Sequence, residues 1–308
     1  MRILAITTGR ADATPLAPVL QVLREKHEVV ISDWEGWFWD EPDPTNYADL
    51  AVVLGDRFEA LSAALYMTVH KIPIAHIHGG ETTRGSFDNQ IRDAITKLSH
   101  IHFAATEKAA ERIADLGERN IFHVGAPGLD NLTDLPKRHV KDRFVITYHP
   151  PTLSVDPVKG VLSMMEALRH FPWCSHIYTS VNNDPGSDEV KKELTRYTKD
   201  ERMFNDITPR EYHLECRRAA VVIGNSSSGV IECPTIGVPS VNIGPRQDGR
   251  EMGPSVFCCG EDEGEIRCAI QRAMAYKGPF TNPYGKPGAS KRIADILSSI
   301  DLTNILIK

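Results

Sequence analysis

The sequence predicts an α/β protein made of two units, each built on a parallel sheet covered by helices. Short runs of β-branched and apolar residues alternate with stretches in which apolar residues recur at helical spacing. This alternation stops near residue 125 and starts again near residue 144. The 308 residues, 41% of them hydrophobic, are enough for two domains of ordinary size.

In the first half, apolar and β-branched runs predict these strands: Arg2–Thr7, Glu28–Ser32, Leu50–Leu54, Ile74–Ile77, Ile101–Ala105 and Ile121–Val124. Helical spacing between them predicts these helices: Pro15–Glu25, Phe58–Val69, Asn89–Leu98 and Lys108–Leu116. The tract Trp34–Asn46, rich in Trp, Asp, Glu and Pro, fits neither period and is predicted to be a loop. Gly125–Arg138 collects turn-forming residues and is predicted to be the linker between the halves.

The second half repeats the pattern, with predicted strands Phe144–Thr147, Ser175–Tyr178, Arg202–Phe204, Ala220–Ile223, Val238–Ile243 and Ser255–Cys258. Its predicted helices are Val158–Phe171, Asp188–Tyr197, Pro209–Arg218, Val230–Pro234, Glu261–Ala275 and Lys291–Ile300. Thr208 and Glu211 form a capping box around a proline at the first helical position. In sheets of this kind ligands bind beyond the carboxyl ends of the strands, so we expect the site in the cleft between the two units.

Composition and charge argue against several classes of function and location. A net charge of −6 without a basic tract argues against non-specific binding of nucleic acid. The six cysteines are scattered and form no C-x-x-C pair, which favours reduced thiols in a cytosolic protein. The N-terminus is too short for a signal peptide's apolar region, and no apolar stretch is long enough to span a membrane. We therefore expect a cytoplasmic protein without a membrane or nucleic-acid partner.

The most informative stretch runs from Gly224 to Glu232, between the apolar runs Ala219–Ile223 and Val238–Ile243. Its pattern predicts a strand, a tight turn and the N-terminus of a helix, where free backbone N–H groups favour an anion such as phosphate. We assign this contact to Ser226, Ser227, Ser228 and Gly229. Glu232 is suited to accept hydrogen bonds from two ribose hydroxyls. The alternative is an ordinary serine N-cap.

Acidic residues follow the predicted strands of the first half. Asp56 and Arg57 come after one strand, Glu81 follows the next, and Asp88 opens a helix that also carries Arg92. We expect Arg57 to contact the substrate or its nucleotide. Three carboxylates at such positions suit general acid–base chemistry, because proximity and partial burial push their pKa values apart. A structural salt bridge of Asp56 with Arg57 and a plain N-cap role for Asp88 are the alternatives.

Further candidates for phosphate binding lie in turns after strands. Arg10 occupies the first turn, His149 is held before two prolines, and Asn183 lies in a polar loop. Arg246 and Arg250 place two guanidinium groups after the strand next to the serine run, and such a fork suits a diphosphate. A surface arginine is the alternative for Arg10.

Neither a metal nor a cofactor is expected. His76 and His78, like His100 and His102, are two residues apart on predicted strands, but no H-E-x-x-H sequence occurs. No G-x-G-x-x-G or P-loop follows the first strand. Nicotinamide chemistry and ATP hydrolysis are therefore weak alternatives.

Six strings carry a resemblance to a known family: GDRFEAL, IPIAHIHGGE, IRDAITKLSHIHFAATE, VGAPGLDNL, NSSSGVIE and VNIGPRQDGRE. Together they resemble the UDP-N-acetylglucosamine 2-epimerases, especially the hydrolysing branch that releases N-acetylmannosamine. The resemblance covers Leu50 to Glu251 nearly continuously. It implies the GT-B fold, with two Rossmann-like, doubly wound domains and the active site in the cleft between them.

The resemblance also implies roles and boundaries. Asp56, Glu81 and Asp88 fall on acid–base positions, while His149, Ser226, Ser227, Glu232 and Arg246 fall on the nucleotide side and Arg10 matches a phosphate contact. Residues 1–135 would carry the carboxylates, 136–285 would bind the nucleotide, and 286–308 would form a helix returning to the first domain. UDP-N-acetylglucosamine and UDP are the expected ligands, His149 joins the catalytic group, and we expect a homodimer or homotetramer.

The expected reaction needs no redox cofactor or metal. The C2 hydrogen of the sugar is not next to a carbonyl, so it becomes removable only as the anomeric bond to the diphosphate breaks. Elimination of UDP would give 2-acetamidoglucal, and addition of water with protonation on the opposite face of C2 would give N-acetylmannosamine. The non-hydrolysing type of epimerase is the less favoured variant.

One feature departs from the family. Only about twenty residues separate Ser32 from Gly55, so this part of the first domain is shorter than in the proteins that the chain resembles. A nucleotide-sugar-binding protein without catalysis is therefore one alternative. A GT-B glycosyltransferase is another, although it would need an acceptor groove rather than three carboxylates.

Overall fold

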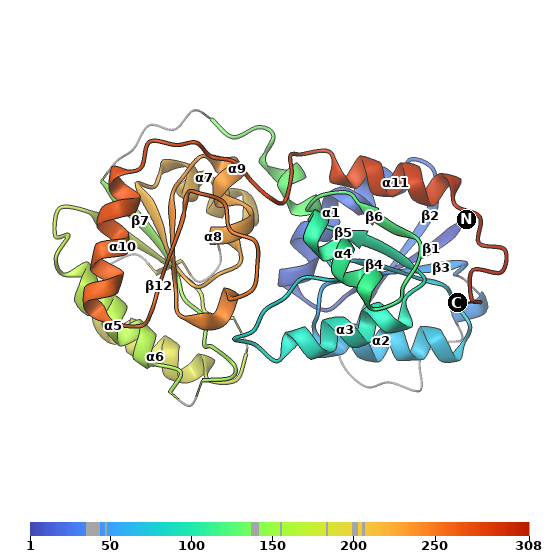
Figure 1. Cartoon of the computed structure of the whole chain (residues 1–308), viewed down its shortest axis with the longest axis horizontal. Coiled ribbons are helices and arrows are strands. Elements are labelled where there is room, and N and C mark those ends of the chain that lie inside the picture. The colour runs from blue at the N-terminus through green and yellow to red at the C-terminus, as the bar shows by residue number, and fades with distance from the viewer. Residues whose placement is uncertain are drawn as a thin grey trace. The chain divides into compact units, whose positions relative to one another are not determined.

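The computed structural model describes residues 1–34, 44–46, 48–136, 142–154, 156–182, 184–198, 203–204 and 207–307. Helices and parallel strands alternate through both halves of the chain, which confirms the predicted fold class. The chain groups into two compact units (Figure 1). The first unit comprises Met1–Thr82, Asp88–Thr133 and Tyr284–Lys308, and the second comprises Thr83–Phe87 and Asp134–Pro283.

The first unit has a six-stranded parallel sheet in the order β2-β1-β3-β4-β5-β6. Its strands are β1 (Arg2–Thr7), β2 (Glu28–Asp33), β3 (Leu50–Leu54), β4 (Ile74–Ile77), β5 (Ile101–Ala104) and β6 (Ile121–His123). Its helices are α1 (Arg10–Leu23), α2 (Phe58–Val69), α3 (Asp88–Leu98), α4 (Glu107–Asp115) and α11 (Ala289–Ser299). Figure 1 shows α1 and α11 on one side of this sheet and α2 and α3 on the other.

Side-chain alternation along the strands supplies both faces of this sheet. In β1, Ile3 belongs to a buried cluster with residues of α1 and α11, whereas Leu4 belongs to a cluster with residues of α2. Successive strand residues point to opposite faces, so a strand that is apolar at every position needs cover on both sides. The carboxyl ends of the central strands remain at one edge, where the loops carry polar residues.

The second unit has its own six-stranded parallel sheet in the order β12-β11-β10-β7-β8-β9. Its strands are β7 (Arg143–Thr147), β8 (Ser175–Thr179), β9 (Met203–Phe204), β10 (Val221–Gly224), β11 (Ser240–Ile243) and β12 (Val256–Cys259). Its helices are α5 (Lys159–Leu168), α6 (Ser187–Tyr197), α7 (Pro209–Arg218), α8 (Ser228–Ile231), α9 (Cys233–Ile236) and α10 (Glu263–Ala275). One buried cluster joins α5, α6 and α10 to this sheet.

Two predicted helices differ from the structure. The first begins at Arg10 rather than Pro15 and keeps Pro15 and Pro18 inside it. Burial of its apolar face against the sheet outweighs the roughly 3 kcal/mol that an interior proline costs. The predicted helix Val230–Pro234 is instead two four-residue helices, α8 and α9. Pro234 has no N–H group to continue the helical hydrogen bonds.

Three further predictions concern the linker, the loop Trp34–Asn46 and the capping box. Within the expected linker, Pro127–Leu132 forms a 3-10 helix that packs on α1 and α11. Most of the predicted loop Trp34–Asn46 lies outside the described residues. The capping box of α7 is confirmed, because Glu211 N donates to Thr208 Oγ1 at 3.3 Å and Thr208 N donates to Glu211 Oε2 at 2.8 Å. No helix in the described parts of the chain is long and apolar enough to cross a membrane.

Candidate active site

The serine loop, Asn225–Ser228, follows β10 in the second unit. It is preceded by Gly224 at the end of β10, which has a φ of 140° and no room for a side chain, because an added Cβ would overlap the carbonyl of Thr147. Only glycine satisfies both demands. Asn225 N then donates to Thr147 O at 3.2 Å, which fixes where the loop leaves the sheet.

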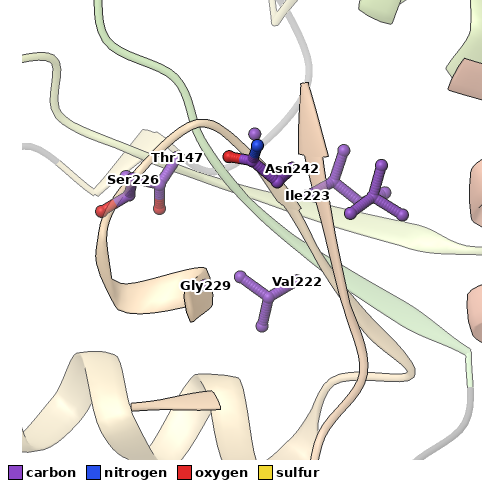
Figure 2. A pocket seen from close by; sticks show the side chains of 8 residues that line it. Thr147, Val222, Ile223, Ser226, Gly229 and Asn242 are labelled. Carbon is purple, nitrogen blue, oxygen red and sulfur yellow. The ribbon is translucent and has the colours of Figure 1, made fainter. Parts of the chain in front are cut away.

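The loop curves around a small hollow (Figure 2). Thr147, Ser226 and Asn242 contribute polar groups to the lining, and Val222, Ile223 and Val241 contribute apolar ones. These residues come from β7, β10 and β11, which are neighbours in the sheet, and from the loop itself. The hollow therefore lies at the carboxyl ends of three adjacent strands, where ligands of such sheets bind.

Each predicted residue of the serine loop has a defined place. Ser227 precedes α8 and its carbonyl accepts from Ile231 N at 2.8 Å, while Ser228 N donates weakly to Ser226 Oγ at 3.4 Å. Gly229 lies in α8, and its carbonyl accepts from Ser240 Oγ at 2.5 Å. Glu232 lies between α8 and α9 rather than one turn inside a continuous helix.

Asn225 connects the serine loop to the segment after β7, and the sequence reasoning gave it no role. Its Oδ1 accepts from His149 N and its Nδ2 donates to His149 O, both at 2.7 Å. Its own carbonyl accepts from Gln247 Nε2 at 3.0 Å and from Arg246 Nη1 at 3.3 Å. Only 1% of Asn225 is exposed, so these bonds are not shared with bulk water. The run of serines beside it gave no sign of this bridging role.

His149 is placed as a neutral hydrogen-bond donor. Asn182 N donates to its Nδ1 at 3.2 Å, and because a backbone N–H can only donate, the proton of the neutral ring lies on Nε2. Burial and the positive charge of Arg246 lower the pKa of His149 to about 3. The ring is therefore uncharged near neutral pH, and its Nε2–H can donate to an anion.

Arg246 has unused hydrogen-bonding capacity. Its Nη2 lies 3.5 Å from Asp184 Oδ2, a long ion pair, and its buried Nε has no partner among the described residues. Such a guanidinium is ready to bind a phosphate. Arg250 lies in the loop that follows the 3-10 helix Pro245–Gln247. Asn183, predicted for the loop after β8, lies outside the described residues.

In the first unit, the predicted carboxylates are organised by Arg92 of α3. This guanidinium is 1% exposed; Nη2 forms an ion pair with Asp56 Oδ2, and Nη1 donates to Glu81 O at 2.7 Å. Asp88 lies one turn before Arg92 on α3, so their side chains project from the same face of the helix. The structure thus brings Asp56 and Glu81 together around a residue that the sequence reasoning mentioned without placing it in the site.

Two histidines form hydrogen bonds with the segments that follow β3 and β4 and carry Asp56 and Glu81. His78, in the left-handed region with a φ of 67°, lies with Nδ1 2.5 Å from Glu81 Oε1. A non-glycine residue in that region is strained and needs its surroundings to hold it. His76 Nε2 donates to Gly55 O at 2.8 Å, and burial lowers the pKa of this ring to about 4. His76 is therefore neutral and fixes the turn that carries Asp56.

Three further residues of the first unit are Arg57, Asp12 and Arg10. Arg57 pairs with Glu59, with Nε 3.2 Å from Oε2. Asp12 of α1 is 5% exposed, and desolvation raises its pKa to about 6 despite a hydrogen bond from Thr8. Arg10 opens α1 after the turn that follows β1. No group of three or more His, Cys, Asp or Glu in the described segments is placed to hold a metal ion.

The two sets of residues share one architectural position. Asp12, Asp56 and Glu81 follow the adjacent strands β1, β3 and β4 of the first sheet. Arg246, the serine loop, His149 and Asp184 follow the adjacent strands β11, β10, β7 and β8 of the second. One unit thus presents carboxylates and the other presents donors for an anion. Two Rossmann-like units of this kind define a protein of the GT-B class.

Comparison with known proteins identifies the family. The family model for UDP-N-acetylglucosamine 2-epimerase matches residues 44–298. The chain is 34% identical to polysialic acid biosynthesis protein P7 of Escherichia coli over 266 residues, which are 79% of this chain and 68% of that protein. The chain belongs to the UDP-N-acetylglucosamine 2-epimerase family.

Two further relatives are informative. The UDP-N,N'-diacetylbacillosamine 2-epimerase (hydrolyzing) of Legionella pneumophila is 32% identical over 273 residues, 82% of this chain and 72% of that protein. The crystal structure of the UDP-GlcNAc 2-epimerase of Methanocaldococcus jannaschii in complex with UDP-GlcNAc and UDP matches with a TM-score of 0.82. That match covers 97% of this chain and 99% of the other at 18% identity, and it supports the fold.

Proposed function

We propose that this protein is a hydrolysing UDP-N-acetylglucosamine 2-epimerase, which converts UDP-N-acetylglucosamine and water to N-acetylmannosamine and UDP. Membership of the family supports the sugar-nucleotide chemistry, and the Legionella relative with its hydrolysing name supports the subtype. The site observation that carries the proposal is the ion pair of Asp56 with the buried Arg92, which also binds the backbone of Glu81. Acid–base groups fixed in this way suit the removal and return of a proton.

The second unit would stabilise the leaving group. As the bond between C1 and the diphosphate oxygen breaks, its electron pair passes to the diphosphate. Arg246, the Nε2–H of neutral His149 and the serine loop would donate hydrogen bonds to the growing negative charge. Glu232 would accept hydrogen bonds from the ribose, and Arg10 and Arg250 would add contacts to phosphate.

The first unit would handle the proton. A carboxylate among Asp56, Glu81 and Asp88 takes the C2 hydrogen as a proton while C1 and C2 become double bonded. Water then adds its oxygen to C1, and a second carboxylate returns a proton to the opposite face of C2. Atoms balance without a redox partner, because the overall change is hydrolysis with inversion at C2.

A second sugar deserves the same test, because the Legionella relative is named for UDP-N,N'-diacetylbacillosamine. The purified protein would be incubated with each sugar nucleotide and the products followed by proton NMR. Free UDP with free N-acetylmannosamine supports the proposal, and release from the diacetylated substrate alone reassigns the sugar. A product still attached to UDP would show the non-hydrolysing reaction, and no turnover of either substrate would refute catalysis.

The predicted homodimer or homotetramer and the cytoplasmic location are further proposals that rest on the sequence and its family. Light scattering on the purified protein tests the assembly, and fractionation of the native cells tests the location.

A further inference from the structure

A five-residue segment of the chain changes units between two of the proposed acid–base residues. The chain leaves the first unit after Thr82, belongs to the second unit over Thr83–Phe87, and re-enters the first at Asp88. In Figure 1 this segment lies between β4 and α3 and contains neither helix nor strand. Glu81 and Asp88 therefore flank a piece of the second unit.

Hydrogen bonds attach this segment, here called the 83–87 tether, to the second unit. Arg84 N donates to Asp248 O at 2.8 Å. Ser86 Oγ and Thr152 Oγ1 share a hydrogen bond of 3.0 Å, and Ser86 is only 4% exposed. Asp248 directly follows the 3-10 helix Pro245–Gln247, so the tether is bonded to the end of the element that carries the proposed diphosphate contact.

Gly85 packs against the backbone of Pro245 and Arg246. A Cβ added at this residue would overlap the carbonyl of Pro245 and lie 2.8 Å from Arg246 N. The obstacle is backbone, so no side chain can rotate away to make room. The glycine is needed here for close packing of two backbone segments.

The length of the intervening chain limits how far Glu81 and Asp88 can lie from Gly85. A fully extended chain spans at most about 3.6 Å per residue. The Cα atoms of Glu81 and Asp88 therefore lie within about 14 Å and about 11 Å of Gly85 Cα, whatever path the chain takes. Gly85 in turn contacts Pro245, next to Arg246.

We propose that the 83–87 tether sets the positions of Glu81 and Asp88 with respect to the diphosphate, and that Gly85 is the positioning residue. This inference rests on the proposed function. A diphosphate bound to Arg246 orders the Pro245–Asp248 turn, to which the tether is bonded. Because the tether continues covalently toward Glu81 at one end and Asp88 at the other, ordering the turn also restricts the positions of these two carboxylates. Reacting groups displaced by about 1 Å can lose about a hundredfold in rate, so loosening the tether lowers turnover more than binding.

The first test compares Gly85→Ala with Gly264→Ala. The control glycine lies in α10, where an added Cβ meets only Asp262 Oδ1 at 3.2 Å. With UDP-N-acetylglucosamine as substrate, Gly85→Ala should lower kcat at least tenfold while KM and the Kd for UDP stay within threefold of the parent. Gly264→Ala should match the parent. A folded Gly85→Ala protein with kcat within twofold of the parent overturns the proposal, as does an equal loss of UDP affinity and kcat.

Hydrogen exchange of the Arg84 amide tests the tether without relying on catalysis. UDP should slow exchange at Arg84 and at the serine loop in the parent, whereas Gly85→Ala should keep the protection of the serine loop and lose that of Arg84. If UDP protects the serine loop but leaves exchange of the Arg84 amide unchanged in the parent, the proposed role of the tether is wrong, even if the enzyme is active. If both segments are protected and no sugar nucleotide is turned over, the proposed function is wrong instead.

A milder pair of substitutions covers the case in which Gly85→Ala fails to fold. Ser86→Ala and Thr152→Val each remove the 3.0 Å hydrogen bond without adding bulk. Each single variant and the double variant should lower kcat by a similar factor, about two- to tenfold, because all three lose the same bond. Unchanged kcat in all three, or effects that multiply in the double variant, contradicts a tether held by this contact.

Discussion

At the scale of residues, the site depends on groups whose partners are distant in sequence. Arg92 pairs with Asp56, 36 residues earlier, and Asn225 bonds to His149, 76 residues earlier. Neither pairing leaves a local pattern, which is why the sequence supplied the carboxylates and the serines but not the residues that join them. The sequence does place Arg92 one turn after Asp88, and that spacing is the feature from which a place for Arg92 beside the carboxylates could have been predicted.

Glu232 offers the clearest test of the nucleotide half. Glu232→Gln removes a charged acceptor proposed to bind ribose hydroxyls, and such a bond is worth roughly 1.5–3 kcal/mol. The Kd for UDP should therefore rise about 10- to 150-fold by calorimetry. Glu189→Gln, on the exposed side of α6, should bind UDP like the parent. Equal UDP affinity in the Glu232 variant would remove this residue from the site.

Asp12 predicts a pH dependence of stability. Burial raises its pKa from 3.8 to about 6, so the folded protein binds more protons than the unfolded chain between these values, and stability falls as pH rises through them. The full cost above pH 6 is about 3 kcal/mol. Asp12→Asn should be more stable than the parent at pH 7.5, with an advantage that shrinks toward pH 4.5. Calorimetric melting at both pH values tests this, and a difference that does not change with pH would contradict it.

At the scale of elements, strands were predicted more closely than turns. Buried parallel strands are continuous apolar runs, so β3 and β4 match their predicted ranges. The failures came where proline and glycine decide, since α1 tolerates two prolines and the stretch around Pro234 breaks into two short helices. The expected linker also contains an ordered 3-10 helix, because its residues bond to α11, which is more than 150 residues away in sequence.

Asp130 links these two elements. Its Oδ2 accepts from Ser290 N at 2.8 Å and its Oδ1 accepts from Gly288 N, so it caps the N-terminus of α11. Asp130→Ala should cost about 1–2 kcal/mol and speed hydrogen exchange in α11, with UDP affinity unchanged. Asp115→Ala, at the exposed end of α4, is the matched control. Unaltered exchange in α11 would show that the cap does not hold the helix.

At the scale of the whole molecule, the two units divide the proposed chemistry. Apart from Arg10, the proposed donors for the nucleotide belong to the second unit, and the three carboxylates belong to the first. The 83–87 tether is covalently joined to the first unit at both of its ends. The sequence predicted this division through the order of its motifs. It did not predict that a segment between Glu81 and Asp88 would pack with the second unit, because Gly85 resembles any turn glycine until the Pro245 backbone is seen beside it.

The central claim is that carboxylates of the first unit move the C2 proton, and the reaction in deuterated water tests it most directly. The proton taken from C2 exchanges with solvent before C2 is reprotonated, so N-acetylmannosamine formed from UDP-N-acetylglucosamine should carry deuterium at C2. Glu81→Gln or Asp88→Asn should lower turnover by about 10²- to 10⁴-fold with nearly unchanged UDP binding. N-acetylmannosamine that keeps protium at C2, or release of UDP with unepimerised N-acetylglucosamine, would contradict the account.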